Sequence, residues 1–107
     1  VVGDNPQLVD INYTLNSNSD WLHANGIDYN ASLDQIVLSV HHLSEIWVID
    51  HSTTTAQAAA HTGGTSGKGG DLLYRWGNPQ AYDAGVAADR KLFLQQKKLI
   101  LLIQFHF

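Results

Sequence analysis

The stretch QIVLSVHHLSEIWVIDH, residues 35–51, predicts two neighbouring β-strands joined by a tight connection. Residues 35–42 are rich in β-branched and apolar side chains, which favour strands. Residues 45–51 place Ile46, Val48 and Asp50 opposite Trp47, Ile49 and His51. Side chains that alternate with a period of two are typical of a strand with two different faces. The segment LSE between the two runs makes the connection.

Further strand signals lie on both sides of this pair. QLVDINYTL (7–15) alternates like a half-exposed strand, DWLHANGIDYN (20–30) predicts a strand ending near Tyr29, and DLLYRWG (71–77) predicts another. The turn clusters NSNSD (16–20) and NASLD (30–34) separate them. Residues 20–77 therefore predict an all-β fold: four antiparallel strands, about one blade of a β-propeller, with residues 7–15 as an adjacent strand of the preceding blade.

The one long connection, residues 51–70, combines a helical signal with a glycine-rich loop. TTTAQAAA predicts a short helical turn with a Thr cap, and HTGGTSGKGG carries five glycines in ten residues. A phosphate-binding P-loop is rejected, because Gly64 and Gly67 are only three residues apart and a strand follows Lys68 and Gly69. A surface loop and an anion-facing loop that uses Lys68 both remain open.

Composition narrows the class of protein. The chain has 107 residues, enough for one small domain, and a formal net charge of -4, which argues against a nucleic-acid partner. It has no Cys, so disulfides and Cys-based zinc sites are excluded. The N-terminus lacks signal-peptide features, and the last nine residues, LILLIQFHF, are too short for a membrane span.

The end of the chain changes character. We expect residues 1–85 to form the blade region and residues 86–107 to form a divergent tail, irregular or helical. The run LILLIQFHF (99–107) has high β-propensity without charge or Pro, a profile that promotes self-association.

The segment DWLHANGIDYN holds the clearest candidate site. In an extended strand Trp21, His23 and Asn25 would point the same way. An aromatic wall, a titratable ring and an amide on one face predict a binding site. A half-buried patch with satisfied hydrogen bonds is the alternative.

Four further histidines, His41, His42, His51 and His61, raise the question of a metal. Neutral imidazole is a common metal ligand, but no H-x-x-x-H pattern is present. His41 and His42 are adjacent, so in a strand their side chains would point to opposite faces. A metal site would then require the fold to bring ligands from separate parts of the sequence together, and we expect no metal site.

A longer series of segments resembles one family. NPQLVDINY, DWLHANGIDYN, LDQIVLSVHHLSEIWVIDHSTTTA, HTGG, GKGGDLLYRWGNPQAY and AADRKLF, in this order, resemble the bacterial arylsulfotransferases over about residues 5–95. The resemblance implies a six-bladed β-propeller several times longer than this chain. It implies transfer of a sulfuryl group from a phenolic sulfate ester to a phenol through a transiently sulfated histidine. The resemblance also implies that the reaction uses no cofactor and no adenosine phosphosulfate donor. It implies a periplasmic or secreted location.

The family motif D-W-x-H-x-N assigns roles by resemblance. It implies that His23 and Asn25 face the sulfuryl group, and that His41 stands where the family has a sulfate-clamping Arg. A His at that position lacks the fork and the permanent charge of Arg. We therefore expect His23 and His41 as catalytic residues, with Asn25, Trp21 and Lys68 as substrate-binding residues.

One difference from the family motif predicts that this chain alone does not catalyse sulfuryl transfer. The segment DRKLFLQQ has Gln96 where the resemblance implies the nucleophilic His, and the likeness ends after Gln95, as a frameshift or early stop would cause. Two hypotheses follow: an inactive fragment of an arylsulfotransferase, or a non-catalytic binding or interaction module that pairs with other chains through open sheet edges.

Overall fold

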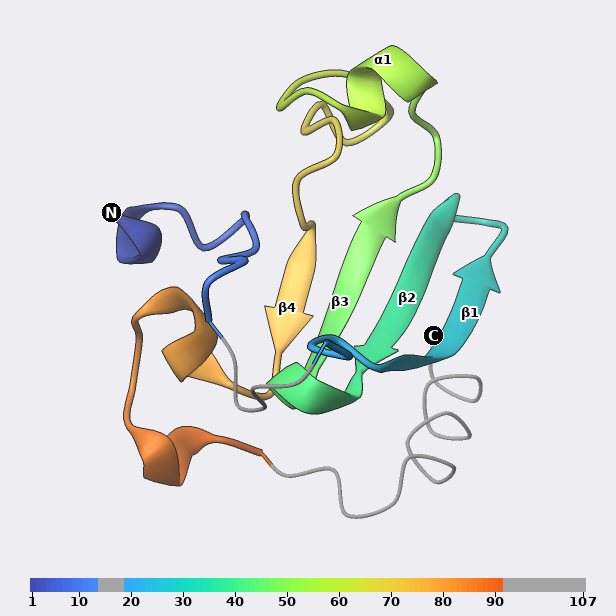
Figure 1. The fold of residues 1–107 in the computed structure, drawn as a ribbon. Coiled ribbons are helices and arrows are strands. Elements are labelled where there is room, and N and C mark those ends of the chain that lie inside the picture. The colour runs from blue at the N-terminus through green and yellow to red at the C-terminus, as the bar shows by residue number, and fades with distance from the viewer. Residues whose placement is uncertain (14–18, 92–107) are drawn as a thin grey trace.

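The computed structural model describes residues 1–13 and 19–91, and its centre is one four-stranded antiparallel sheet (Figure 1). The strands follow the chain in the order β1-β2-β3-β4. Their bounds are β1 (Ala24–Asn30), β2 (Gln35–Val40), β3 (Glu45–Asp50) and β4 (Tyr74–Trp76). The all-β, blade-like fold predicted from residues 20–77 is confirmed. The predicted tail lies outside the described residues from residue 92 onward.

The β2–β3 hairpin forms as the sequence predicts, although β2 is shorter. Val40 pairs with Glu45 and Leu38 pairs with Trp47. Between the strands, η2 (His41–Leu43) is a 3₁₀ turn, and Ser44 closes it in the left-handed region at φ 56°. Leu43, the last residue of this turn, is 1% exposed and packs in the core.

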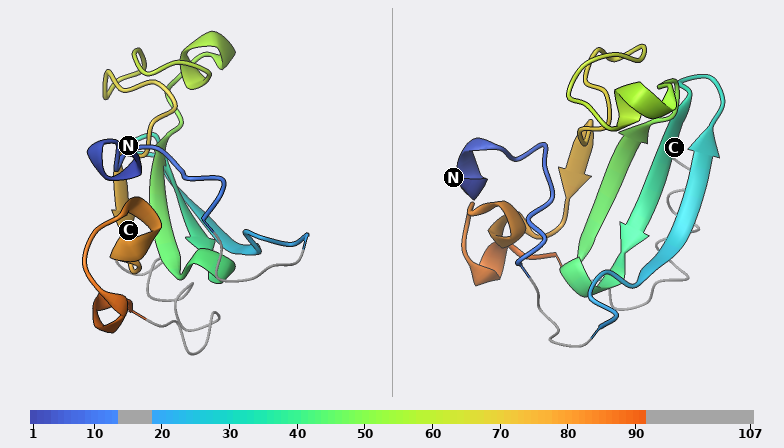
Figure 2. Two further views of the ribbon diagram at one scale, coloured as in Figure 1. Left: turned by 60° about the vertical axis from the view of Figure 1, so that its left-hand side comes forward. Right: turned by 45° about the horizontal axis from the view of Figure 1, so that its top comes forward.

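The core lies on one face of the sheet. Val40, Leu43, Trp47 and Leu72 form a buried cluster. Partly buried side chains pack against this cluster, and several come from segments outside the sheet: Val9, Tyr13, Trp21 and Leu22. The N-terminal segment runs beside β4, where the Leu72 amide donates to the Gln7 carbonyl at 2.9 Å (Figure 2).

A buried ion pair crosses the same face. Arg75 of β4 donates from Nε and Nη2 to the two carboxylate oxygens of Glu45, at 3.0 and 2.6 Å. The side chains are 6% and 0% exposed. The Trp47 indole donates to the same carboxylate at 2.6 Å. Arg75 Nη1 also donates to the carbonyls of Pro6 and Leu8, at 3.2 and 2.9 Å, so the guanidinium fastens the N-terminal segment to the sheet.

The prediction of a strand over residues 7–15 is wrong for the residues that the structure describes, 7–13. The Asn12 amide donates to the Asp10 carboxylate at 2.9 Å, and the Tyr13 amide donates to the Asp10 carbonyl at 3.2 Å. Asp10 thus forms an Asx turn, which competes with extended pairing. Residues 14 and 15 lie outside the described part of the chain.

The helical turn predicted after β3 is confirmed as α1 (Thr55–Ala58). Thr54 and Gln57 form a reciprocal capping box, with bonds of 3.2 and 2.9 Å. Within the described part of the chain, no helix has the length and hydrophobicity that crossing a bilayer requires. The other helical segments are single 3₁₀ turns: η1 (Val2–Asp4), η3 (Pro79–Tyr82) and η4 (Ala87–Asp89).

Asp50, at the end of β3, holds the glycine-rich loop. Its carboxylate accepts from the Ser52 hydroxyl at 2.5 Å, the Ser52 amide at 2.8 Å and the Ser66 amide at 3.1 Å. Gly64 passes close by with φ 72°, and a Cβ there would lie 2.7 Å from a carboxylate oxygen of Asp50. Glycine at position 64 therefore lets the loop close on Asp50.

Removing one partner of the buried ion pair is expected to destabilise the chain strongly. Arg75→Met leaves the Glu45 carboxylate buried without its counter-charge, which costs about 3–5 kcal/mol of unfolding free energy. Urea unfolding followed by Trp fluorescence measures this cost. The double variant Glu45→Leu/Arg75→Met is the control, because it removes both charges and is expected to recover most of the loss. A cost below about 1 kcal/mol for Arg75→Met would contradict a stabilising role.

The loop is expected to loosen in acid. Hydrogen bonds from the Ser52 side chain first, then from the backbone of residues 52 and 66, lower the pKa of Asp50 below its ordinary value against the opposing effect of burial. A carboxylate whose pKa is lowered in the folded state stabilises the fold at pH values above its unfolded-state pKa of about 3.9. This stabilisation is lost as the pH falls through the pKa of the folded state. The protection of the Thr65 and Ser66 amides against hydrogen exchange should therefore decrease when the pH is lowered below about 4.

The variant Asp50→Asn should abolish this pH dependence and loosen the loop already at neutral pH. Asp4→Asn, at an exposed carboxylate, is the matched control and should leave the protection unchanged. Equal protection of residues 65 and 66 at pH 3 and pH 6 in the unaltered chain would show that Asp50 does not hold the loop.

Candidate functional site

The motif segment crosses the end of the sheet, and its first residues are not part of a strand. β1 begins at Ala24, so the expectation of an extended strand through Trp21 and His23 is wrong. His23 has φ 46°, in the left-handed region, which breaks the alternation of side chains. Two backbone bonds still join this segment to η2: the amides of His41 and His42 donate to the carbonyls of His23 and Leu22, at 3.2 and 3.1 Å.

These bonds bring three imidazole rings together, and we name His23, His41 and His42 the histidine cluster. The ring centroids of His23 and His41 lie 5.4 Å apart in an edge-to-face arrangement. His42 lies 4.9 Å from His23 and 5.0 Å from His41. The expectation that His41 and His42 point to opposite faces is wrong, because β2 ends at Val40 and η2 follows.

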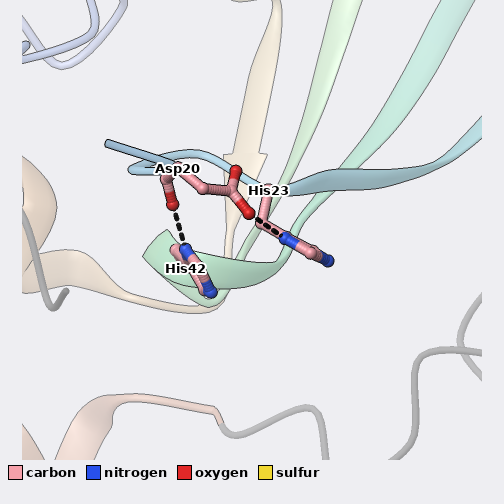
Figure 3. A group of neighbouring side chains, drawn as sticks. All are labelled: Asp20, His23 and His42. Carbon is pink, nitrogen blue, oxygen red and sulfur yellow. Dashed lines mark hydrogen bonds and ion pairs between the residues drawn. The ribbon is translucent and has the colours of Figure 1, made fainter. Parts of the chain in front are cut away.

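Asp20 joins the histidine cluster (Figure 3). His23 Nδ1 donates to the Asp20 carboxylate, and His42 Nδ1 donates to the Asp20 backbone carbonyl. The hydrogen bond from His23 lowers the pKa of the Asp20 carboxyl, and the charges of His23 and His42 add to this against desolvation. Asp20 is thus an anion that holds two rings of the cluster in place.

His41, like His42, is partly buried. Desolvation lowers the pKa of its imidazole, and the neighbouring rings of His42 and His23 lower it further, while Asp20 opposes them. His41 is therefore neutral at neutral pH. It can donate one N–H bond to an anion, whereas an Arg in its place would offer a permanent charge and a fork of donors.

Asn25 lies at an irregularity of β1. The pairing with β2 shifts register between Ala24 and Gly26, so Asn25 is the extra residue of a bulge. Its side-chain Oδ1 is buried and has no hydrogen-bond partner. A shallow pocket is lined there by Ala24, Asn25, Gly26, Ile27 and Leu38. The alternative of an Asn25 fully satisfied by protein groups does not hold for this oxygen.

The other two predicted site residues lie apart from the rings. Trp21 is partly buried and packs against the hydrophobic core. Lys68 is exposed in the glycine-rich loop that follows α1, at the end of β3 away from η2 (Figure 1). The structure therefore brings together His23 and His41, but not Lys68.

The sequence reasoning gave no role to Asp20 and dismissed His42. One ligand atom each from Asp20, His23 and His42 lie within 4.8 Å of one another. The signal for Asp20 is its i,i+3 spacing from His23 within the quoted motif. The signal for His42 was hidden, because residues 41 and 42 were predicted to continue the strand of residues 35–42.

The comparisons with known proteins agree with the resemblance. The arylsulfotransferase (ASST) family model matches residues 5–64, which include the motif segment, strands β1 to β3 and α1. Neither a curated protein nor a solved structure matches the chain. The family match covers more than half of the 107 residues. The chain therefore belongs to the arylsulfotransferase family.

Proposed function

We propose that this chain carries part of a site that transfers a sulfuryl group from a phenolic sulfate ester to a phenol. The observation that carries the proposal is the contact between the rings of His23 and His41, which are 5.4 Å apart in a member of this family. Two imidazoles that project from adjoining segments can donate to different oxygens of one sulfate group. By the resemblance, the proposal includes an exported location.

The chemistry of sulfuryl transfer explains why such donors are needed. As in phosphoryl transfer, charge spreads over the equatorial oxygens while the entering and leaving atoms stand in line. Fixed N–H donors stabilise that charge. The ring of His23 is exposed and oriented by Asp20, and Asn25 offers its amide nearby in the sequence. A nucleophilic imidazole elsewhere would form the N–S bond while the S–O bond to the phenol breaks and the phenolate leaves.

We further propose that the chain alone binds aryl sulfate without turning it over. Gln96 occupies the position that the resemblance gives to the nucleophilic His, and an amide cannot form the sulfated intermediate. The second candidate, a non-catalytic binding module, shares this outcome. Release of nitrophenol from nitrophenyl sulfate, dependent on a phenol acceptor, would overturn the proposed inactivity.

Binding of nitrophenyl sulfate is expected to depend on His23 and His41. His23→Asn keeps a residue that tolerates the left-handed backbone, and it should weaken binding about tenfold, the scale of one hydrogen bond to a charged group. His41→Arg should tighten binding several-fold, because it restores a permanent charge and a bidentate donor. Chemical-shift titration of the 107-residue chain measures both changes.

His61→Gln is the matched control, because His61 also donates to an aspartate, at 2.6 Å from Asp71, but lies outside the cluster. It should bind nitrophenyl sulfate like the unaltered chain. If His23→Asn and His61→Gln bind the ester equally well, His23 does not contact the sulfate group and the proposed site is wrong.

We also propose self-association through β1. This strand is an edge of the sheet in the described part of the chain, and Ile27 and Tyr29 on it are 66% and 49% exposed. Open edges invite pairing with a second copy, and a Lys on the edge opposes it. Light scattering after size exclusion should show concentration-dependent oligomers, and Ile27→Lys should shift them toward the monomer.

Val86→Lys is the control for this substitution, because Val86 is 59% exposed but lies outside the sheet. It should leave the distribution of oligomers unchanged. A chain that stays monomeric at every concentration would refute pairing through β1.

A further inference from the structure

We propose that Asp20, His23 and His42 form a binding site for a divalent ion of the Zn²⁺ class. One ligand atom from each of these side chains lies within 4.8 Å of the other two. In a tetrahedral zinc site with bonds of about 2.0–2.2 Å, ligand atoms are roughly 3.3–3.6 Å apart. Side-chain rotation has to close the remaining gap when an ion binds. The fold brings these ligands together, because residues 20–23 and residue 42 belong to different segments of the chain.

The donor set selects the class of ion. Two imidazoles and one carboxylate suit Zn²⁺, Co²⁺, Ni²⁺ or Cu²⁺, whereas Mg²⁺ and Ca²⁺ prefer sites made of oxygen. Each ring binds through an unprotonated nitrogen, so a ring that carries both protons releases one on binding. The Asp20 and His23 side chains are about half exposed, so water can complete the coordination.

The backbone around the three side chains is already in place for binding. The two backbone bonds from residues 41 and 42 to residues 23 and 22 hold the motif segment against η2. The His23 backbone is held in the left-handed region, a conformation that functional sites often retain at some energetic cost. Little ordering would therefore remain to be done when an ion binds, and the ion would link the motif segment to η2.

The other histidine–carboxylate pairs of the described residues provide a natural comparison. His51 lies 2.7 Å from Asp34, and His61 lies 2.6 Å from Asp71. Each pair offers one ring and one carboxylate, one ligand fewer than the proposed site. A chelate of two ligands holds an ion much less firmly than one of three, so the pairs are matched controls for nonspecific binding.

This inference does not depend on the proposed sulfuryl transfer, since Asp20 and His42 have no direct contact with sulfate in that proposal. It differs from the expectation of no metal site, which rested on opposite directions for His41 and His42. Because His23 belongs to both sites, the tests that separate them use Asp20 and His42.

The decisive experiment is a titration of the tag-free chain with Zn²⁺ by calorimetry, repeated with Co²⁺ and visible spectroscopy. We expect one ion per chain at the strongest site and the intense visible bands of a low-symmetry Co²⁺ complex. Asp20→Asn and His42→Gln should each weaken Zn²⁺ binding by at least about tenfold, since even outer-shell changes cost metal sites that much. His51→Gln and His61→Gln should leave it unchanged.

Circular dichroism shows whether each variant folds. Asp20 is exposed, so Asp20→Asn keeps the test decisive if His42→Gln fails to fold. The proposal is overturned if the unaltered chain binds Zn²⁺ no more tightly than Asp20→Asn does. It is also overturned if His61→Gln or His51→Gln weakens binding as much as the cluster variants do.

Discussion

The ion pair between Glu45 and Arg75 is the interaction on which the arrangement of this small sheet depends. Both side chains are buried, and the guanidinium also reaches two carbonyls of the N-terminal segment and lies over the ring of Tyr82, 4.4 Å from its centroid. One charged group thus joins β3, β4, the N-terminal segment and η3. In so small a core, burial of apolar surface alone holds such segments weakly. Because the pair is buried, separating the two side chains leaves an unpaired buried charge, which is energetically costly. Arrangements of these segments that separate Glu45 from Arg75 are therefore disfavoured.

The candidate site lies at the end of the hairpin that contains Glu45. Leu43 is buried in the core, so the chain leaves β2 at Val40, turns through η2 and enters β3 at the buried carboxylate. That turn presents His41 and His42 to the motif segment, where Asp20 orients His23 and His42. The short turn η2 therefore contributes both Leu43 to the core and His41 and His42 to the histidine cluster.

The two central strands could be predicted from sequence because their signals are local: residues 35–42 are rich in β-branched and apolar side chains, and residues 45–51 alternate with a period of two. The capped turn at Thr54 was also predictable, since its capping box is contained within four residues. The conformation of residues 7–13 could not be predicted from alternation, because the Asx turn at Asp10 overrides it. The histidine cluster was missed for a related reason: a strand extended by two residues sends His41 and His42 apart, whereas a 3₁₀ turn brings their rings within 5.0 Å. The Glu45–Arg75 pair joins residues thirty positions apart, a distance at which one sequence carries no pairing signal.

The histidine cluster supports both the family chemistry and the proposed metal site, so its geometry is the central claim. Nuclear Overhauser spectroscopy of the histidine-ring protons tests it directly in solution. With ring centroids 4.9–5.4 Å apart, cross-peaks are expected between the rings of His23, His41 and His42, and none from these three to the ring of His61. A His23 ring that shows no cross-peak to either His41 or His42 would contradict the site.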